Sequence, residues 1–117
     1  MSSKAPESSI EYNDFLKVDI RVGTIREVRK NEKARVPAFI LTIDFGDIGI
    51  KESSAQIIEN YLEEDLVGRQ IVAVTNFPPK HVAGIKSEVL VLAAICVKNG
   101  TILLEPRSPV NNGSRIL

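Results

Sequence analysis

Basic side chains gather in two stretches that are far apart along the chain. The first stretch is dominated by bases, with Arg26, Arg29, Lys30, Lys33 and Arg35 against Glu27 and Glu32. The second contains Lys80, His81 and Lys86, and Lys51 lies between the two stretches in sequence. Lysine and arginine are common partners of phosphate oxygens. If the fold brings these stretches to one side, they form a phosphate-binding surface. The alternative is a scattered set of solvated charges.

The residue types needed for metal binding or covalent catalysis are scarce. Cys96 and His81 are the only cysteine and histidine, too few for a structural zinc site, and the apolar run around Cys96 is typical of a buried cysteine. Ser53 and Ser54 have only His81 as a possible base, and no GxSxG turn surrounds them. The acidic run 63–65 is typical of a solvated helix end. We therefore predict a binding protein with no catalytic residue, no metal and no cofactor.

Length, charge and hydropathy narrow the class of binding protein. The 117 residues are enough for one domain with one core. Lysine plus arginine and aspartate plus glutamate both total 15, which argues against a protein that coats nucleic acid nonspecifically. No apolar run reaches the length of a membrane span, and the polar N-terminus lacks the apolar segment of a secretory signal. We expect a cytoplasmic protein without membrane insertion, with a flexible tail at 1–11 and one domain at 12–117.

The first half of the chain is predicted to form one helical turn and three short strands. One helical turn is expected over 12–17, with Tyr12, Phe15 and Leu16 facing the body. Alternation of apolar and polar residues over 17–28 predicts a half-buried strand, in which Gly23 suggests a bulge or tight bend. A second alternating strand is expected over 37–45, with Phe39, Leu41, Ile43 and Phe45 on one face, and a third over 48–53.

The second half contains one expected helix and two apolar strands. Ser53 to Gln56 resembles a capping box, which predicts a helix that ends at Gly68. The apolar runs 71–77 and 89–97 predict strands covered on both faces, separated by an irregular loop over 78–86. Asn99-Gly100 predicts a two-residue hairpin turn into a further strand. Five strands, one helix between strands 3 and 4, and a C-terminal hairpin extension predict an all-β protein, an OB-fold five-stranded Greek-key barrel.

The two fully apolar strands predict association. A barrel core covers only one face of each strand, so the other face needs a cover. A second copy related by a two-fold axis is the commonest solution, and we expect a homodimer. The alternative is that the chain's own terminal segments cover these faces.

Four segments together resemble the tRNA-binding-domain family: KVDIRVGTI (17–25), SSAQI (53–57), VGRQIVAVTNFPP (67–79) and GIKSEVLVLAA (84–94). This family is the OB-fold module attached to some methionyl- and phenylalanyl-tRNA synthetases. Over 12–117 the chain looks most like the CsaA group, stand-alone dimers proposed as chaperones in protein export. The resemblance implies unfolded or precursor polypeptides, tRNA and the protein-export machinery as partners.

The resemblance also implies site residues. The segment Asn76 to Lys80 matches an Asn-Leu-x-Pro-basic pattern of the relatives, and Gly84 to Glu88 matches their Gly-Val-Lys-Ser-Glu. In an OB-fold the ligand lies across the second and third strands between two loops. The candidate nucleic-acid-binding residues are Lys33, Arg35, Lys51, Ser54, Asn76, Lys80, Lys86, Ser87 and Glu88. Ser54 could instead cap a helix, and Glu88 could pin the loop through a salt bridge.

Two departures from the relatives' pattern favour an apolar or mixed ligand. The relatives usually carry Gly-Met where this chain has Val89-Leu90, and often Met-Arg where it has Val82-Ala83. An exposed apolar loop suits an extended peptide, and the candidate peptide-binding residues are Phe77, Pro78, Pro79, Val82 and Ile85. These residues could instead pack against the other subunit. The sequence thus predicts a CsaA-like dimeric chaperone. The alternative is a tRNA-binding or structured-RNA-binding protein, and a third hypothesis is an adaptor that only docks partner proteins.

Overall fold

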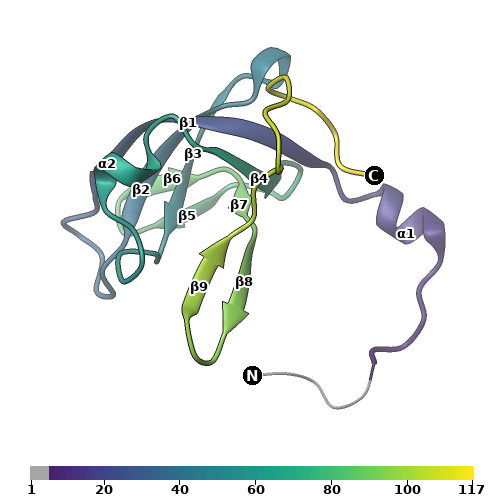
Figure 1. Ribbon diagram of the computed structural model, residues 1–117, viewed down its shortest axis with the longest axis horizontal. Helices are drawn as coiled ribbons and strands as arrows, with labels where there is room; N and C mark the ends of the chain where they lie inside the picture. Colours follow the sequence, from purple (N-terminus) through teal and green to yellow (C-terminus); the bar gives the residue numbers. More distant parts are fainter. Residues whose placement is uncertain (1–5) are drawn as a thin grey trace.

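Five strands form one antiparallel sheet that curls into a nearly closed barrel. The hairpin formed by residues 93–103 projects from this barrel (Figure 1). The computed structural model describes residues 6–117. The sheet has the order β3-β2-β1-β4-β7, with bounds β1 Ile20–Lys30, β2 Phe39–Asp44, β3 Ile50–Ala55, β4 Gln70–Val74 and β7 Leu90–Val91. The remaining elements are α1 Tyr12–Leu16, a 3₁₀ turn Gly46–Ile48, α2 Glu63–Leu66, the hairpin β5 Lys80–Val82 with β6 Ile85–Ser87, and the hairpin β8 Ala93–Cys96 with β9 Gly100–Leu103. The predicted all-β OB-fold with a C-terminal hairpin extension is confirmed.

The barrel closes where the chain entering β7 lies along β3. The Glu88 backbone N–H donates to the Glu52 carbonyl at 2.8 Å. The Ser54 N–H donates to Ser87 Oγ at 3.0 Å, and Ser53 Oγ donates to the Val89 carbonyl at 3.1 Å. These bonds give the outer strand β3 a partner on its second edge, so it is not left open to pair with another chain.

The core confirms the predicted alternation in the second strand. Phe39, Leu41, Ile43 and Phe45 are all buried in the central cluster. Of the bulge or tight bend expected at Gly23, the bulge is wrong, because β1 passes through Gly23 in regular register with β4 and its one irregularity lies between Ile25 and Glu27. Glycine is needed there for space, since a Cβ would lie 2.7 Å from both Ile43 Cγ2 and Phe45 Cδ1.

The expected helix after the third strand is mostly wrong. β3 continues through Ala55, so Ser53 to Gln56 is not a capping box, and Ser53 is buried with its hydroxyl used in barrel closure. These tertiary bonds override the local capping signal. A helix does lie between the third and fourth strands, but α2 is a single turn of four residues.

Two further local expectations need correction. Most of the stretch 78–86 is not irregular, because residues 80–87 form the β5–β6 hairpin around Ala83 and Gly84, whose φ values are 45° and 86°. Positive φ at both central residues is typical of a type I′ turn. The run 89–97 is divided between β7 and β8, and the β8–β9 turn spans 97–99, so the predicted two-residue turn at Asn99-Gly100 is wrong.

The outer face of β4 is covered within one copy. Val72 and Val74 are only 8% and 5% exposed. C-terminal residues also pair with the start of β1, where the Val22 N–H donates to the Ser114 carbonyl at 2.9 Å and the Ile116 N–H donates to the Ile20 carbonyl at 2.9 Å. The apolar face of β4 is therefore covered within one copy and does not by itself require a second copy.

The N-terminal segment projects from the barrel. α1 is the predicted helical turn, but Tyr12 is 69% exposed and Leu16 is also exposed, so the expectation that they face the body is wrong. Figure 1 shows α1 and the preceding segment extending away from the sheet. Residues 1–5 of the expected tail lie outside the described residues, and 6–11 have no regular secondary structure. No helix in the described part of the chain is long and apolar enough to span a membrane.

Candidate binding grooves beside the β5–β6 hairpin

Two grooves flank the β5–β6 hairpin. We call the first the basic groove; its volume is about 350 Å³, and its lining is Lys33, Ala34, Arg35, Val36, Ala38, Ser54, Gln56, Val82 and Ala83. We call the second the apolar groove; its volume is about 480 Å³, and its lining is Phe77, Pro78, Pro79, Lys80, Ser87, Glu88, Val89 and Leu90. Both volumes are within the range of ligand sites.

The basic groove lies where the β1–β2 loop meets the tip of the hairpin. Backbone bonds close the loop over 31–38, since the Asn31 N–H donates to the Ala38 carbonyl at 3.0 Å. The Asn31 side chain also accepts from the Lys33 N–H at 3.1 Å. The Lys33 side chain then lies over the hairpin tip, where a Cβ on Gly84 would be 2.9 Å from its Cδ. Neither Lys33 nor Arg35 forms an ion pair within residues 6–117, so both charges are available to an anion.

Two other bases of the first stretch, Arg26 and Arg29, are held in internal ion pairs. β1 extends to Lys30, so Arg26 and Arg29 lie on a strand and not in the loop. Arg26 Nη2 lies 2.6 Å from Asp44 Oδ2, and Arg29 Nη2 lies 3.2 Å from Glu52 Oε2. The backbone N–H of Gly46, followed by Arg26, lowers the pKa of Asp44 below its ordinary value. Lys30, at the end of β1, has no ion pair within residues 6–117 but does not line the basic groove, so the bases of the first stretch that line this groove are Lys33 and Arg35.

Two further candidate bases lie outside both grooves. Lys51 Nζ is 3.9 Å from Glu88 Oε2. Lys86 pairs with His81 across the hairpin, and because side chains alternate along a strand, this pair faces away from Val82 and Ser87. Lys33, Arg35 and Ser54 line the basic groove together with Val82. Lys51 and Lys86 do not line this groove.

Ser54, Ser87 and Glu88 hold the barrel closed. Glu88 Oε1 accepts from the Glu52 N–H at 3.1 Å, in addition to its contact with Lys51. The salt-bridge alternative for Glu88 is thus what the structure shows, strengthened by bonds to the backbone. The helix-cap alternative for Ser54 is wrong because Ser54 lies in β3. Ser54 lines the basic groove, whereas Ser87 and Glu88 line the apolar one.

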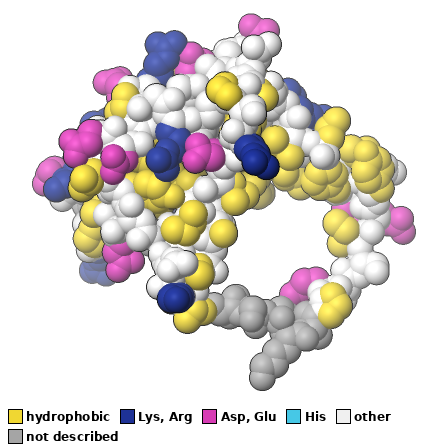
Figure 2. All heavy atoms as spheres, in the orientation of Figure 1, with side chains coloured by type: hydrophobic (Ala, Val, Ile, Leu, Met, Phe, Trp, Pro, Cys, Tyr) yellow, Lys and Arg dark blue, Asp and Glu magenta, His cyan; other side chains and the backbone are white. Residues whose placement is uncertain are grey.

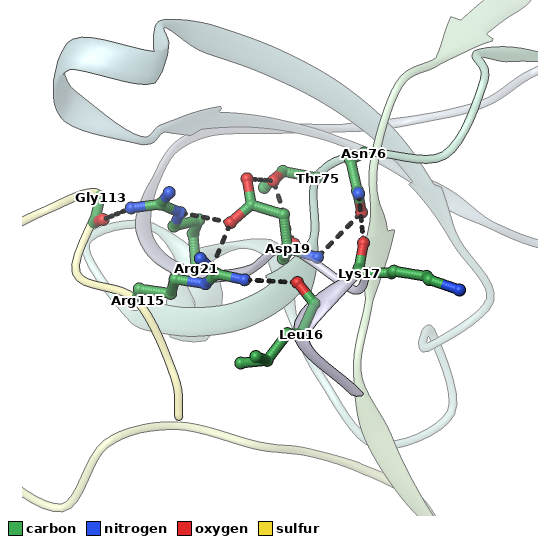
Figure 3. A network of polar contacts seen from close by, with 8 residues as sticks. All are labelled: Leu16, Lys17, Asp19, Arg21, Thr75, Asn76, Gly113 and Arg115. Carbon is green, nitrogen blue, oxygen red and sulfur yellow. Dashed lines mark hydrogen bonds and ion pairs between the residues drawn. The ribbon is translucent and has the colours of Figure 1, made fainter. Parts of the chain in front are cut away.

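Asn76 lies at the root of α1 and lines neither groove. Its Nδ2 donates to the Lys17 carbonyl at 2.7 Å, and its Oδ1 accepts from the Asp19 N–H at 2.9 Å (Figure 3). A single carboxamide thus serves as donor and acceptor to the backbone and fastens the end of β4 to the start of β1. The structure supports a positioning role for Asn76.

The carboxylate of Asp19 organises a polar network that no sequence motif predicted. Asp19 accepts from Arg21 Nε at 2.7 Å and from Thr75 Oγ1 at 2.8 Å, and Arg115 Nε lies 3.6 Å away (Figure 3). Arg115 in turn donates to the Leu16 carbonyl at 2.9 Å. Partial burial raises the pKa of Asp19, but the hydrogen bonds and the two arginine charges outweigh it and lower the pKa below 3.8. The network joins the root of α1, β1 and the C-terminus.

The apolar groove gathers only part of the predicted peptide-binding set. Phe77, Pro78 and Pro79 line it, and Phe77 is 52% exposed. Val82 and Ile85 instead pair with each other at the hairpin tip, and Val82 lines the basic groove. Val89 and Leu90, predicted from sequence only to depart from the relatives' pattern, also line this groove, and Leu90 is 51% exposed.

The family model described as "Putative tRNA binding domain" matches residues 20–115. The chain belongs to this tRNA-binding-domain family. A solved structure of chaperone CsaA from Bacillus anthracis is 50% identical, with a TM-score of 0.89, and the match covers 94% of this chain and 100% of that one. CsaA chaperone protein from Picrophilus torridus is 51% identical, with a TM-score of 0.87 and coverage of 93% and 100%.

The family also occurs inside larger proteins. A methionine–tRNA ligase from Methanococcoides burtonii is 33% identical over 107 residues, which is 92% of this chain but 16% of the ligase. The chain therefore spans about a sixth of the length of that relative. What it shares with the ligase is the tRNA-binding-domain module.

Proposed function

We propose that the chain is a homodimeric chaperone that binds unfolded or export-bound polypeptides in the apolar groove. The observation that carries the proposal is the groove itself, which presents Phe77, Pro78, Pro79 and Leu90 at the surface. Likeness to two CsaA chaperones over nearly the full chain supports it. The chaperone acts in the cytoplasm, with protein-export machinery as a downstream partner.

The groove suits a short apolar segment of an extended chain. Burying a large apolar side chain is worth roughly 1.5–3 kcal/mol, so Phe77 and Leu90, each about half exposed, contribute about 1 kcal/mol apiece on contact. Lys80, on the groove rim, adds a site for a client carbonyl or carboxylate. Such binding is weak and reversible, as capture and release of a client require.

The projecting β8–β9 hairpin supports the dimer. Ile95, Val97, Ile102 and Leu104 are exposed on it, with Val97 84% exposed. At roughly 1 kcal/mol per side chain, burial of these residues on both copies yields on the order of 8 kcal/mol. That sum lies within the ~4–15 kcal/mol cost of association, so a stable pair needs further buried surface.

Aggregation of an unfolded client, followed by light scattering, tests the chaperone. We expect suppression without ATP, and weaker suppression by Phe77→Ser. Val67→Ser is the matched control, because Val67 is also 52% exposed but lies outside the apolar groove. Equal loss in both variants, or no suppression by the unaltered protein, contradicts the proposal.

A second candidate function is binding of tRNA or another structured RNA, favoured by the free charges of Lys33 and Arg35 in the basic groove. Each phosphate neutralised contributes about 0.9 to the slope of log affinity against log salt concentration. Replacing both residues with alanine should flatten the slope by about 1.4–1.8, the values for two phosphates of a single strand and of a B-form duplex. Lys98→Ala, in the remote β8–β9 turn, should leave the slope unchanged. An unchanged slope in the double variant contradicts phosphate binding here.

A further inference from the structure

A further hollow continues the basic groove away from the hairpin tip. We call it the side pocket; its volume is about 530 Å³, and its lining is Val36, Pro37, Gln56, Ile58, Glu59 and Thr101. Val36 and Gln56 line both hollows, so the basic groove and the side pocket adjoin. A ligand that contacts Lys33 and Arg35 in the basic groove therefore has room to extend into the side pocket.

The walls of the side pocket come from separate segments that are fixed to one another. Ile57 is 4% exposed and anchors the segment after β3 in the core. Asn60 Nδ2 donates to the Asn99 carbonyl at 2.9 Å and to the Thr101 carbonyl at 3.0 Å, which ties this segment to the β8–β9 hairpin. Glu59 lies between Ile57 and Asn60 in sequence, so its backbone is held on both sides. Walls held in this way bind a ligand without first having to be ordered.

The polar side chains of the side pocket have no partners of their own in the protein. Glu59 forms no ion pair within residues 6–117. Its Oε2 would lie 3.9 Å from a Cβ on Gly100, so the carboxylate is beside the start of β9. The side chains of Gln56 and Thr101 form no hydrogen bond in the same part of the chain. The rest of the lining is apolar, and an apolar hollow with a few polar groups is typical of a ligand site.

The charges of the two hollows favour a ligand with two different ends. Lys33 and Arg35 attract phosphate oxygens, whereas Glu59 repels them. Figure 2 shows acidic and basic side chains close together, with hydrophobic ones between them, on the side of the barrel where Figure 1 labels α2. A ligand with a phosphate at one end and an uncharged ring with N–H donors at the other satisfies both hollows. An unpaired nucleotide of RNA is such a ligand.

The carboxylate of Glu59 distinguishes the four bases by their hydrogen-bond donors. An ionised carboxylate only accepts hydrogen bonds, and its two oxygens accept from a pair of adjacent donors. Guanine presents such a pair on its Watson–Crick edge, the N1–H and the N2 amino group. Adenine and cytosine each present one amino group beside a ring nitrogen that accepts, and uracil presents one N–H between two carbonyls. The contact through both oxygens is therefore available to guanine and not to the other three bases.

We propose that the side pocket binds an unpaired guanine of a structured RNA whose phosphates contact Lys33 and Arg35. This inference rests on RNA binding, the second candidate function, and adds a base preference to it. Glu59 selects the base, and Asn60 is a positioning residue that holds the neighbouring wall in place.

Fluorescence anisotropy with a labelled RNA stem-loop tests the preference. The loop consists of uridines except at one position, which carries guanine, adenine, cytosine, uracil or hypoxanthine, the base that lacks the N2 amino group of guanine. We expect the guanine RNA to bind on the order of 10-fold more tightly than the adenine RNA. The hypoxanthine RNA should bind with intermediate affinity, because it keeps only one of the two donors.

Two variants with the same change of charge locate the selection. Glu59→Gln should remove the preference for guanine. Glu64→Gln is the matched control, because Glu64 is also an exposed glutamate but does not line the side pocket, and it should keep the preference. Any gain in affinity that the two variants share for all the RNAs reflects the lost negative charge.

The outcomes separate the base site from RNA binding as such. Equal affinity for all the RNAs, with the salt dependence expected of phosphate contacts, overturns the base site and leaves RNA binding standing. A guanine preference that survives in Glu59→Gln, while that variant binds a lysine-rich unfolded polypeptide more weakly, assigns the side pocket to polypeptides and overturns the proposal. No binding of any RNA overturns both RNA binding and the base site.

Discussion

Replacement of Asn76 by alanine separates its positioning role from a binding role. The side chain makes two backbone hydrogen bonds, to the Lys17 carbonyl at 2.7 Å and from the Asp19 N–H at 2.9 Å. A hydrogen bond contributes about 0.5–1.5 kcal/mol net. Because Asn76 is exposed, water replaces part of the loss, and we expect a free energy of unfolding lower by about 1–2 kcal/mol. For a domain of this size that corresponds to a fall in Tm of about 4–8 °C.

Thermal unfolding followed by circular dichroism measures the Tm, and titration with tRNA and with an unfolded polypeptide measures affinity. Asn13→Ala is the matched control, since Asn13 is an exposed asparagine of α1 whose side chain forms no hydrogen bond within residues 6–117. We expect Asn76→Ala to lower the Tm and leave RNA affinity unchanged. An unchanged Tm together with a large loss of RNA affinity would refute the positioning role and would show that Asn76 contributes to RNA binding.

Three other substitutions test the fold. Gly23→Ala should destabilise the protein by about 1–3 kcal/mol in urea unfolding, because the new methyl would lie 2.7 Å from the buried Ile43 and Phe45. Ala83→Asn should stabilise it by about 1 kcal/mol in the same assay, because asparagine tolerates the left-handed φ of 45° better than alanine. Asp19→Asn should lower the Tm at neutral pH but match the unaltered protein in acid. The pKa of Asp19 is lowered in the fold, so its contribution is present above the unfolded pKa of about 3.9 and disappears as pH falls through the folded value.

Each of these expectations can fail separately. A Gly23→Ala protein of full stability would mean that β1 shifts easily, as the bulge predicted from sequence would allow. Loss of stability in Ala83→Asn would mean that the hairpin tip does not hold the left-handed turn. A Tm deficit of Asp19→Asn that persists at low pH would assign the effect to shape and not to charge.

The sequence predicts the barrel because its strands bury alternate residues. The period-two pattern from Phe39 to Phe45 requires no tertiary knowledge, and it corresponds to β2. The prediction of a helix directly after the third strand was wrong for the opposite reason. Ser53 and Ser54 satisfy a local capping pattern, yet their polar groups serve barrel closure with Ser87 and Val89, and no local pattern reports a bond between residues so distant in sequence.

The same limit applies to the site. Lys33 and Arg35 could be predicted because they are bases in a loop of known position in an OB-fold. The pairing of Arg26 with Asp44 and of Arg29 with Glu52 could not, because it depends on the register of β1, β2 and β3. The role of Asn76 was assigned through resemblance, and only the path of α1 shows where its carboxamide points.

The most direct test of the account is a paired measurement of affinity for an unfolded polypeptide and for tRNA. A double variant, Phe77→Ser with Leu90→Ser, should lose about 2 kcal/mol of polypeptide binding, roughly 30-fold in Kd, with its tRNA affinity unchanged. A second, Lys33→Ala with Arg35→Ala, should show the reverse pattern. If both variants weaken both ligands equally, the two grooves are not separate sites and the account is wrong.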